Sequence, residues 1–474
     1  MKKIILLTCA AAALLSGCSL IPDYMRPDLP VAQSWPQGPG YGEQGAPKAD
    51  APTVAELSWK QFFVDPSMQA LIQQSLDNNR DLRVAALNIE AARATYRISE
   101  ANLLPQINAG GSETEQRIPR RLSSTVPQQA MTTRTYSANL GVTAFELDLF
   151  GKLRSQEEQA LQQFLATQEA RTATQISLIA EVANAYLTLL GDRKLLALTE
   201  ETLGTREKSL SLIERSFDRG VGSQLDVAQA RSAVETARVA RIRYLRQVEQ
   251  DKNALVLLVG SPIDETKLSL TGDLDSVRFV EDLSAGLPSQ VLLKRPDIMQ
   301  AEYSLQAANA NIGAARAAFF PSISLTGTFG SASNTLDTLF QGASRAWTFV
   351  PQMSVPIFDE GRNQANLDSA KAGRDIAVAQ YEKSIQSAFR EVADALAAKG
   401  TLTDQMKSQA ALVAATQDSY RLSQARYSRG VDSYLTVLDS QRSLFSAQQD
   451  LVSVQVSRLS NLVTLYKVLG GGQS

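Results

Sequence analysis

The stretch RGVGSQLDV at residues 219–227 returns almost unchanged as RGVDSYLTV at residues 429–437. A shift of 210 positions keeps the two copies aligned without a gap as far as Gly260 on Gly470. Similarity at one fixed spacing is typical of a chain that repeats a structural unit. The sequence therefore predicts a duplicated protein, with a first repeat at 63–260, a linker at 261–295, a second repeat at 296–470 and a tail at 471–474.

The upstream parts of the two repeats align with a larger shift of 216 positions. The aligned pairs include Asp81 on Asp297, Ala85 on Ala301, Pro105 on Pro321 and Ile107 on Ile323. Pro105 lies 46 positions before Gly151, whereas Pro321 lies 40 positions before Gly361, a difference of six. We expect this insertion to be confined to one loop of the first repeat.

Alternation with a period of two predicts a hairpin of strands in each repeat, at about 105–147 and about 321–357. On one face we expect Tyr136, Ala138, Leu140, Val142 and Ala144 in the first repeat, and Ile323, Leu325, Gly327 and Phe329 in the second. The opposite faces carry Ser, Asn, Gly and Thr. Such strands suit a membrane barrel with lipid outside and water inside. Strands of a soluble antiparallel sandwich alternate as well, so the strands alone leave both architectures open.

The remainder of each repeat predicts helices. Residues 152–218 and 362–429 contain no proline and carry apolar residues at helical spacing, so each could form one helix about 100 Å long. Shorter helices at 79–104 with 223–259, and at 296–320 with 433–469, would fit end to end beside the long ones. Coiled-coil hairpins of a soluble scaffold have a similar composition, but they would leave the strand hairpins without a role.

The repeated letters themselves predict tight tips between helices, at 219–223 and 429–433. Glycine permits the left-handed backbone that ends a helix, and serine can cap the helix that follows. The tip residues are Arg219, Gly220, Val221, Gly222 and Ser223 in the first repeat, and Arg429, Gly430, Val431, Asp432 and Ser433 in the second. Turn chemistry explains the glycines and serines, but it does not explain the repeated Arg and Val.

Composition excludes several classes of function. The chain has 47 Lys and Arg against 49 Asp and Glu, which leaves no basic field for a nucleic acid. Histidine is absent and the only cysteines are Cys9 and Cys18, so the usual zinc sites and nucleophile–histidine pairs are excluded. No paired acids suggest a carboxylate-dependent hydrolase. We expect no catalytic site, no metal site, no cofactor and no enzyme.

The N-terminus MKKIILLTCAAAALLSGC reads as a secretory signal peptide at 1–17, because its apolar run is too short to span a bilayer. The letters LSGC at 15–18 resemble a bacterial lipobox, in which cleavage precedes the cysteine and a lipid is attached to it. We therefore expect a lipid on Cys18, with Ser19 after it favouring the outer membrane. A plain signal peptide with an incidental cysteine is the alternative. Residues 18–62 are rich in Pro and Gly and are expected to form an extended arm.

Four strands cannot close a barrel, and open strand edges are not tolerated in lipid. Two chains would give about eight strands, a barrel whose interior is filled by side chains. Three chains are the smallest assembly that leaves a water-filled hole. We therefore expect a homotrimer that shares one barrel of about twelve strands.

Six motifs in the same order resemble the outer-membrane factor family, the TolC-like exit ducts, and most closely its lipidated OprM-like branch. They are LSGC at 15–18, DLFGKLR at 148–154, LPSQVLLKRPDI at 287–298, FFPSISL at 319–325, PIFDEGR at 356–362 and RGVDSYLTVLDSQRSLF at 429–445. The resemblance implies a trimeric twelve-stranded barrel in the outer membrane, a twelve-helix tunnel across the periplasm and an equatorial belt that includes the linker. It also implies a periplasmic adaptor and an inner-membrane pump, often of the resistance-nodulation-division type.

The function implied is passive export of drugs or other small molecules. A duct for type I protein secretion, or a structural helical lipoprotein, are the alternatives. By the same resemblance the tips contact the adaptor, and Tyr427, Leu435, Asp439 and Arg442 form a periplasmic gate. A ring of Asp439 would select cations and be held shut by pairs to Arg442 or Tyr427 from neighbouring helices.

Three of the gate residues, Tyr427, Asp439 and Arg442, differ between the repeats, because Phe217, Gln229 and Ser232 occupy the matching positions of the first repeat. Leu435, Asp439 and Arg442 are spaced four and three apart, which places them on one helix face. An exposed ion pair worth about 0.5 kcal/mol and nothing more is the alternative. Asp218, Asp226 and Asp432 are weaker candidates for the same lining.

Overall fold

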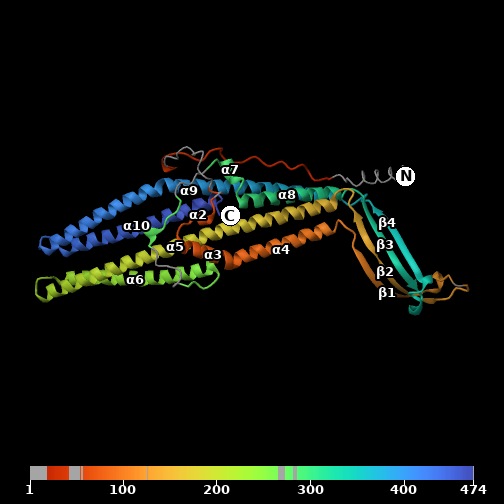
Figure 1. Ribbon diagram of the computed structural model, residues 1–474, viewed down its shortest axis with the longest axis horizontal. Helices are drawn as coiled ribbons and strands as arrows, with labels where there is room; N and C mark the ends of the chain where they lie inside the picture. Colours follow the sequence, from red (N-terminus) through yellow and green to blue (C-terminus); the bar gives the residue numbers. More distant parts are fainter. Residues whose placement is uncertain are drawn as a thin grey trace. The chain divides into compact units, whose positions relative to one another are not determined.

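The computed structural model describes residues 19–41, 54, 57–124, 126–264, 273–280 and 286–472 (Figure 1). The signal peptide, Cys18 and parts of the predicted linker lie outside these residues. The chain divides into two compact units, and each takes segments from both repeats. We call them the strand unit (Met1–Pro27, Asn88–Thr167 and Gln300–Tyr381) and the tip unit (Asp28–Leu87, Gln168–Met299 and Glu382–Ser474).

The strand unit contains one antiparallel sheet of four strands in the order β1-β2-β3-β4. The strands are β1 (Ile107–Ile118), β2 (Met131–Leu147), β3 (Ser322–Ser333) and β4 (Arg345–Ser354). The two hairpins, one from each repeat, are joined through β2 and β3. Because β1 and β4 lie at the ends of this order, each has one edge that no described strand of the chain pairs.

The two faces of the sheet differ in chemistry, as the alternation predicts. One row across the four strands is Ala109, Leu140, Phe329 and Trp347, in directly opposed positions. The neighbouring row on the other face is Asn108, Gly141, Thr328 and Thr348. The apolar row is not covered by the rest of the chain, since Trp347 is 75% exposed. An uncovered apolar face opposite a polar one is the pattern of a strand wall between lipid and water.

The predicted alternation is wrong at one position of β2. A bulge lies between Val142 and Phe145, and Ala144 within it has φ 54°. Phe145 and not Ala144 therefore continues the apolar face, opposite Leu325. A bulge adds one residue to one strand, so a strict period of two cannot follow the chain through it.

The predicted position of the insertion is also wrong. The loops that join the strands span 119–130 and 334–344, so they differ by only one residue. The strands differ more, because β2 has 17 residues and β4 has 10. Most of the extra length of the first repeat therefore extends β2, whose first residues pair with β1 beyond the last β3 pair, Tyr136 with Ser333.

The remaining described chain is mostly helical. The main helices are α3 (Pro66–Asn78), α4 (Arg80–Ala101), α5 (Lys152–Asp218), α6 (Gln224–Val259), α8 (Pro296–Ala317), α9 (Arg362–Ser428) and α10 (Tyr434–Val468). Short helices are α2 (Trp59–Phe62) and α7 (Pro288–Leu292), with 3-10 turns at η1 (Pro39–Tyr41), η3 (Arg120–Leu122), η4 (Leu274–Ser276), η5 (Leu336–Thr338) and η6 (Gly342–Ser344). The two proline-free runs of the sequence are the two 67-residue helices α5 and α9.

An aromatic cluster holds segments from both ends of the chain together in the tip unit. The ring of Phe62 stacks on that of Tyr466 at 4.2 Å and on that of Phe279 at 5.4 Å, measured between centroids. Nearby, the buried Arg295 of the KRPDI motif donates to the Val468 carbonyl at 2.9 Å and to the Glu391 carboxylate at 2.9 Å. Buried rings and a fully paired guanidinium are features of a fixed core.

Candidate functional site

The two tips have the same backbone. Gly220 and Gly430 adopt φ of 77° and 74°, the left-handed conformation that ends a helix. The Val221 N–H donates to the Ser216 carbonyl at 3.0 Å, and the Val431 N–H donates to the Arg426 carbonyl at the same distance. The repeated sequence therefore folds into the same turn twice, once between α5 and α6 and once between α9 and α10.

The side chains that close the tips differ. In the first tip the Ser223 hydroxyl accepts from the Asp226 N–H at 3.1 Å, and the Asp226 carboxylate accepts from the Ser223 N–H at 3.2 Å. This is the predicted serine cap, completed as a reciprocal capping box. In the second tip the Ser433 side chain makes no cap bond, so that prediction is wrong there. The third helical position holds Thr436, which has no carboxylate to complete the box.

The second tip is closed by an ion pair. The Asp432 carboxylate accepts from Arg426 Nε at 2.6 Å and from Arg426 Nη2 at 2.9 Å. This bond holds the pKa of Asp432 below its usual range. At both tips the repeated Arg and Val project outward, and Val221 is 82% exposed. An exposed valine next to an exposed arginine is more than a turn requires, so these side chains are free to meet a partner.

The two tip hairpins pack on each other inside the tip unit. Their shared apolar cluster contains Ile213, Val227, Ala230 and Ala233 from the first repeat, and Tyr434, Val437 and Leu438 from the second. Tyr427 packs against this cluster, with its ring 5.6 Å from that of Tyr434. Burial raises the pKa of Tyr434 to about 12. The hairpins are therefore joined behind their tips by close packing of side chains from both repeats.

The structure brings three of the four predicted gate residues together. Leu435, Asp439 and Arg442 lie on one exposed face of α10, and Asp439 Oδ1 is 3.6 Å from Arg442 Nη1. The pair lies within one helix, whereas pairs between helices were predicted. Tyr427 is turned away from this face into the packed cluster. Of the weaker candidates, Asp226 caps α6, Asp432 pairs with Arg426 and Asp218 is exposed at the end of α5.

Arg206 of α5 is a buried cation that the sequence did not indicate. It is 4% exposed, donates to the Ala233 carbonyl of α6 at 2.9 Å, and lies 5.6 Å above the Phe445 ring of α10. No described carboxylate pairs with it, and its Nε has no partner among the described residues. Burial lowers the pKa of Arg206, and the charge of Arg442 lowers it further. Thr416 holds the matching position of the second repeat.

A pair of carboxyl groups was also missed. Burial raises the pKa of Asp192 to about 6, helped by a hydrogen bond to Asp251 and by the charge of Asp251, while Arg243 opposes the shift. Asp251 is 8% exposed. Two carboxyl groups that share a site cannot both ionise easily. The second repeat has Leu402 and Asn461 at these positions, so the pair exists in one repeat only.

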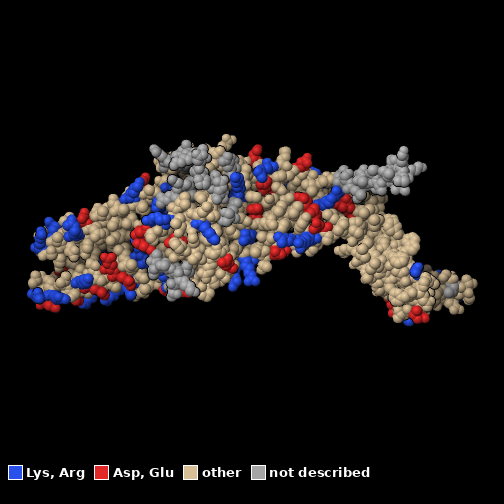
Figure 2. Space-filling view, viewed as in Figure 1, with Lys and Arg blue, Asp and Glu red and all other residues tan. Residues whose placement is uncertain are grey.

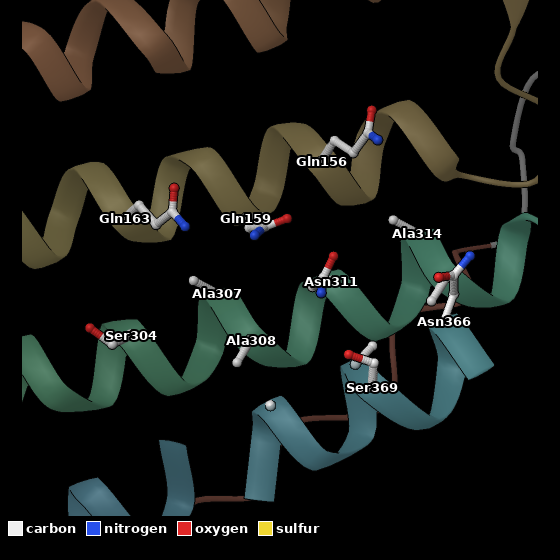
Figure 3. A pocket seen from close by; sticks show the side chains of 13 residues that line it. Gln156, Gln159, Gln163, Ser304, Ala307, Ala308, Asn311, Ala314, Asn366 and Ser369 are labelled. Carbon is white, nitrogen blue, oxygen red and sulfur yellow. The ribbon is translucent and has the colours of Figure 1, made fainter. Parts of the chain in front are cut away.

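A groove without charge runs along α5, α8 and α9 in the strand unit (Figure 3). It has a volume of about 610 Å³, and the side chains of Gln159 from α5 and Asn311 from α8 project into it. Its other lining residues are Gln156, Gln163, Ser304, Ala307, Ala308, Ala314, Ala315, Asn366, Ser369, Ala370 and Gly373. Amides, hydroxyls and small side chains give a wettable wall with no group for chemistry.

The opposite face of α8 is covered by the N-terminal arm. The Arg316 guanidinium donates to the Leu20 carbonyl at 3.1 Å, and the Asn309 amide donates to the Pro22 carbonyl at 2.8 Å. Arg26 pairs with Glu302 at 2.8 Å. Positions 302, 309 and 316 are seven apart and share one helix face, whereas 304, 308, 311 and 315 of the groove lie on the other. The groove therefore faces away from the arm.

No group of three or more Cys, Asp or Glu side chains in the described part of the chain could hold a metal ion. The geometry offers two exposed tips, a charged helix face behind one of them, a neutral groove and a sheet with one apolar face. None of these features supplies a nucleophile or an activated base. All of them suit the wall of a passage.

Comparison with known proteins agrees with the interpretation of these features as the wall of a passage. The family model described as outer membrane efflux protein matches residues 71–261 and 287–471. The toluene efflux pump outer membrane protein TtgC of Pseudomonas putida is 53% identical over 472 residues, which cover 100% of this chain and 96% of the relative. The outer membrane protein OprJ of Pseudomonas aeruginosa is 45% identical over 461 residues, covering 97% of this chain and 94% of the relative.

Solved structures show the same fold. A membrane protein from Pseudomonas aeruginosa aligns with a TM-score of 0.88 at 44% identity, covering 96% of this chain and 100% of that one. The open state of the Neisseria gonorrhoeae MtrE outer membrane channel aligns with a TM-score of 0.85 at 39% identity, covering 96% of this chain and 99% of that one.

The chain belongs to the outer membrane efflux protein family. Its fold is that of the trimeric outer membrane channels, a membrane β-barrel continued by a long helical barrel, built from internally duplicated protomers with four strands each. It is an outer-membrane efflux duct and not an enzyme. The expected fold class, localisation and export function are confirmed. Because the relatives are efflux proteins, they decide against the two alternative functions, a structural scaffold and a protein-secretion duct.

Proposed function

We propose that three copies of this chain form the exit duct of a tripartite efflux system, with a periplasmic adaptor and an inner-membrane pump of the resistance-nodulation-division type. The duct would pass small organic molecules outward without chemistry of its own. The observation that carries this proposal is the sheet, which has one apolar face, one polar face and two free edges.

The free edges support closure by three chains. All neighbouring strands are antiparallel, so β4 runs opposite to β1. The β4 edge of one chain can therefore pair with the β1 edge of the next in the same antiparallel sense. Three chains would close twelve strands, which is wide enough for a water-filled passage. The polar face with Asn108, Thr328 and Thr348 would line it.

The neutral groove supports passive transport. We place it on the lumen of the tunnel, because the arm covers the opposite face of α8. A wall of amides and hydroxyls gives a passing molecule only weak hydrogen bonds that water replaces at little cost. Cargo of either charge would leave such a wall quickly. The efflux relatives are named for toluene, solvents and antibiotics, and we extend that range of small organic cargo to this duct.

The tips and the α10 face support assembly and gating. We propose that the ten residues of the two tips contact the adaptor, because their arginine and valine side chains are exposed at helix ends. We propose that Leu435, Asp439 and Arg442 narrow the passage behind them, since they are exposed on one face of α10. In this proposal Tyr427 does not line the passage. It positions α10 through its contact with Tyr434.

The arm supports a lipid anchor at Cys18. Leu20 is fixed to Arg316, near the end of α8, and β3 begins five residues after α8 ends. The first described residues of the arm therefore lie close to the start of the barrel strands. A lipid there could enter the inner leaflet of the outer membrane beside the barrel.

Single-channel conductance of the purified, lipidated protein in a planar bilayer tests the duct. We expect small resting currents that rise when Asp439→Ser and Arg442→Ser are combined, because the proposed gate loses its ion pair. A matched variant with Gln229→Ala and Ser232→Ala, at the corresponding positions of α6, should leave the currents unchanged. Silence in every variant would contradict the duct, whereas equal and large currents would remove only the gate.

A further inference from the structure

The hairpin of the first repeat extends beyond the rest of the sheet. The last pair between β2 and β3 is Tyr136 with Ser333, but β1 and β2 continue to the pair Ile118 with Met131. The outer five pairs of this hairpin therefore have no third strand of the same chain beside them among the described residues. Their side chains are mainly charged or polar, so this segment rises out of the apolar band of the sheet.

The projecting hairpin is strongly basic. Residues 114–135, which form the projecting hairpin, include four arginines and one acidic residue, Glu115. Arg134 is neutralised by Glu115 at 3.1 Å and Glu113 at 3.6 Å. The guanidinium groups of Arg117, Arg120 and Arg121 are exposed, and none makes a hydrogen bond or ion pair with a described residue. Figure 2 shows the strands almost free of charge except near the loops that join them.

Exposed apolar side chains accompany these arginines. In the same loop, Leu122 is 78% exposed and Val126 is 97% exposed. Three free guanidinium groups and two exposed aliphatic side chains in one hairpin match an amphiphile that carries phosphate at one end and hydrocarbon at the other.

The register fixes the side of the barrel to which this loop belongs. Arg117 is opposite Thr132, four pairs beyond Glu113 and Tyr136, on the same face as Leu140 and Trp347. Along this face the order is an apolar row, then Tyr136 opposite Glu113, then Arg134 opposite Glu115, and then Arg117. Aromatic side chains mark the edge of the hydrocarbon, and charged side chains beyond them lie at headgroup depth. Arg117 therefore faces the outer leaflet and not the lumen.

We propose that Arg117, Arg120 and Arg121, together with Leu122 and Val126, bind a phosphorylated lipid of the outer leaflet. The guanidinium groups would take its phosphates in two-pronged hydrogen bonds, and the aliphatic pair would contact the start of its acyl chains. The binding site rests on the orientation of the sheet in the outer membrane and is independent of the proposed gate, tips and pump.

The second hairpin provides an internal comparison. Its loop, 334–344, contains Asp337 and no Lys or Arg. Its hydroxyl groups bond within the loop, such as Ser344 Oγ to the Thr338 carbonyl at 2.7 Å. This loop lies at the same end of the sheet, and the single cation beside it is Arg345, the first residue of β4. The binding site is therefore specific to the first repeat, where the sheet is longer.

Native mass spectrometry of the intact trimer with added lipid tests this proposal. The probes are a diphosphorylated glucosamine lipid, the same lipid without its phosphates, and inorganic phosphate. We expect the phosphorylated lipid to bind and the combined variant Arg117→Gln, Arg120→Gln and Arg121→Gln to bind it about tenfold more weakly. Arg219→Gln combined with Arg429→Gln, at the tips, should bind it as the wild type does.

Three results would overturn the proposal: equal binding of the lipid with and without phosphate, unchanged binding by the triple variant, or full displacement of the lipid by low concentrations of inorganic phosphate. The last would identify a site for free anions. If the triple variant fails to form trimers, the single variant Val126→Asp and a salt titration of the wild type replace it. Unchanged lipid binding in both the Val126→Asp variant and the salt titration would also contradict the proposal. Conductance of the same samples reports separately on the duct.

Discussion

The two tips of this chain share a backbone and differ in almost everything behind it. Both turns use a left-handed glycine and the same valine hydrogen bond. Behind the first tip lie Gln229 and Ser232 on α6, whereas behind the second lie Asp439 and Arg442 on α10. Duplication has therefore kept the turns and changed the residues that, in the proposed gate, would face the passage.

The same contrast recurs deeper in the helices. Arg206 and Asp192 of α5 are charged groups in partly or fully buried positions, and the second repeat has Thr416 and Leu402 in their places. A buried charge is costly unless it is well paired. Replacing these residues should therefore have measurable effects that differ between the two repeats.

The largest consequence is expected at Arg206. Arg206→Ala removes the donor to the Ala233 carbonyl and opens a space below the Phe445 ring. We expect the local unfolding free energy of α6 near Ala233 to fall by about 3 kcal/mol. Native-state hydrogen exchange measures it. Thr416→Ala is the control and should change the matching part of α10 by no more than about 0.5 kcal/mol. Equal losses in both repeats would contradict the comparison.

The second-largest effect is expected when the exposed residues of α10 are replaced by those at the matching positions of α6. Asp439→Gln with Arg442→Ser gives the second repeat the residues of the first. Three contacts of Asp439 or Arg442 with neighbouring helices of the trimer, at about 0.5 kcal/mol each, would correspond to about a tenfold rise in the ratio of open to closed channels. The preference for cations should also fall, as read from the reversal potential in a salt gradient.

The reverse exchange sharpens this result. Gln229→Asp with Ser232→Arg places the same pair on α6, and it should not restore the closed state when the α10 pair is missing. Restoration would show that the position of the pair around the tunnel is unimportant.

A smaller effect is expected from Asp192. Its pKa is raised from 3.8 to about 6, so the folded state holds its proton more tightly than the unfolded state does. The stability from this proton is complete below pH 3.8 and is lost as pH rises through about 6. Asp192→Asn should remove this decline and raise Tm by a few degrees at pH 7. Thermal scans across that range measure it, with the exposed Asp394→Asn as control; identical pH profiles for wild type and Asp192→Asn would exclude the shared proton.

The smallest effect should be the same in both tips. Gly220→Ala and Gly430→Ala force alanine into a left-handed conformation, which costs about 1 kcal/mol in each case. Hydrogen exchange of the two turns should therefore accelerate about equally. Gly204→Ala in the interior of α5 meets no neighbouring atom and should have the opposite sign, a gain of about 1 kcal/mol. Unequal losses at the tips would show that their surroundings, and not only their backbones, set their stability.

Much of the fold could be predicted from the sequence, because its signals are periodic. The absence of proline from 152 to 218 predicts α5, which the structure has at Lys152–Asp218. Alternation predicts both hairpins, but it cannot detect the bulge at Ala144 or the extra length of β2. Both depend on which residue of a neighbouring strand lies opposite, and a single strand does not encode that.

The candidate site was less predictable. Spacing alone places Leu435, Asp439 and Arg442 on one face, and the structure has them there. It could not show that Tyr427 turns into the cluster, because that depends on a contact with the other hairpin. Arg206 gave no signal, since a single arginine among many looks the same in sequence whether it is buried or exposed.

The sheet order has a consequence for assembly. Within one chain β2 already pairs with β3, a seam between repeats that matches the seam β4 must make with β1 of the next chain. Single repeats with two strands each would need six chains to meet before twelve strands closed, whereas the duplicated chain needs three. By mass action the yield of closed barrels then follows the third power of chain concentration in place of the sixth. A cell that makes few copies of this chain can therefore still complete its barrels.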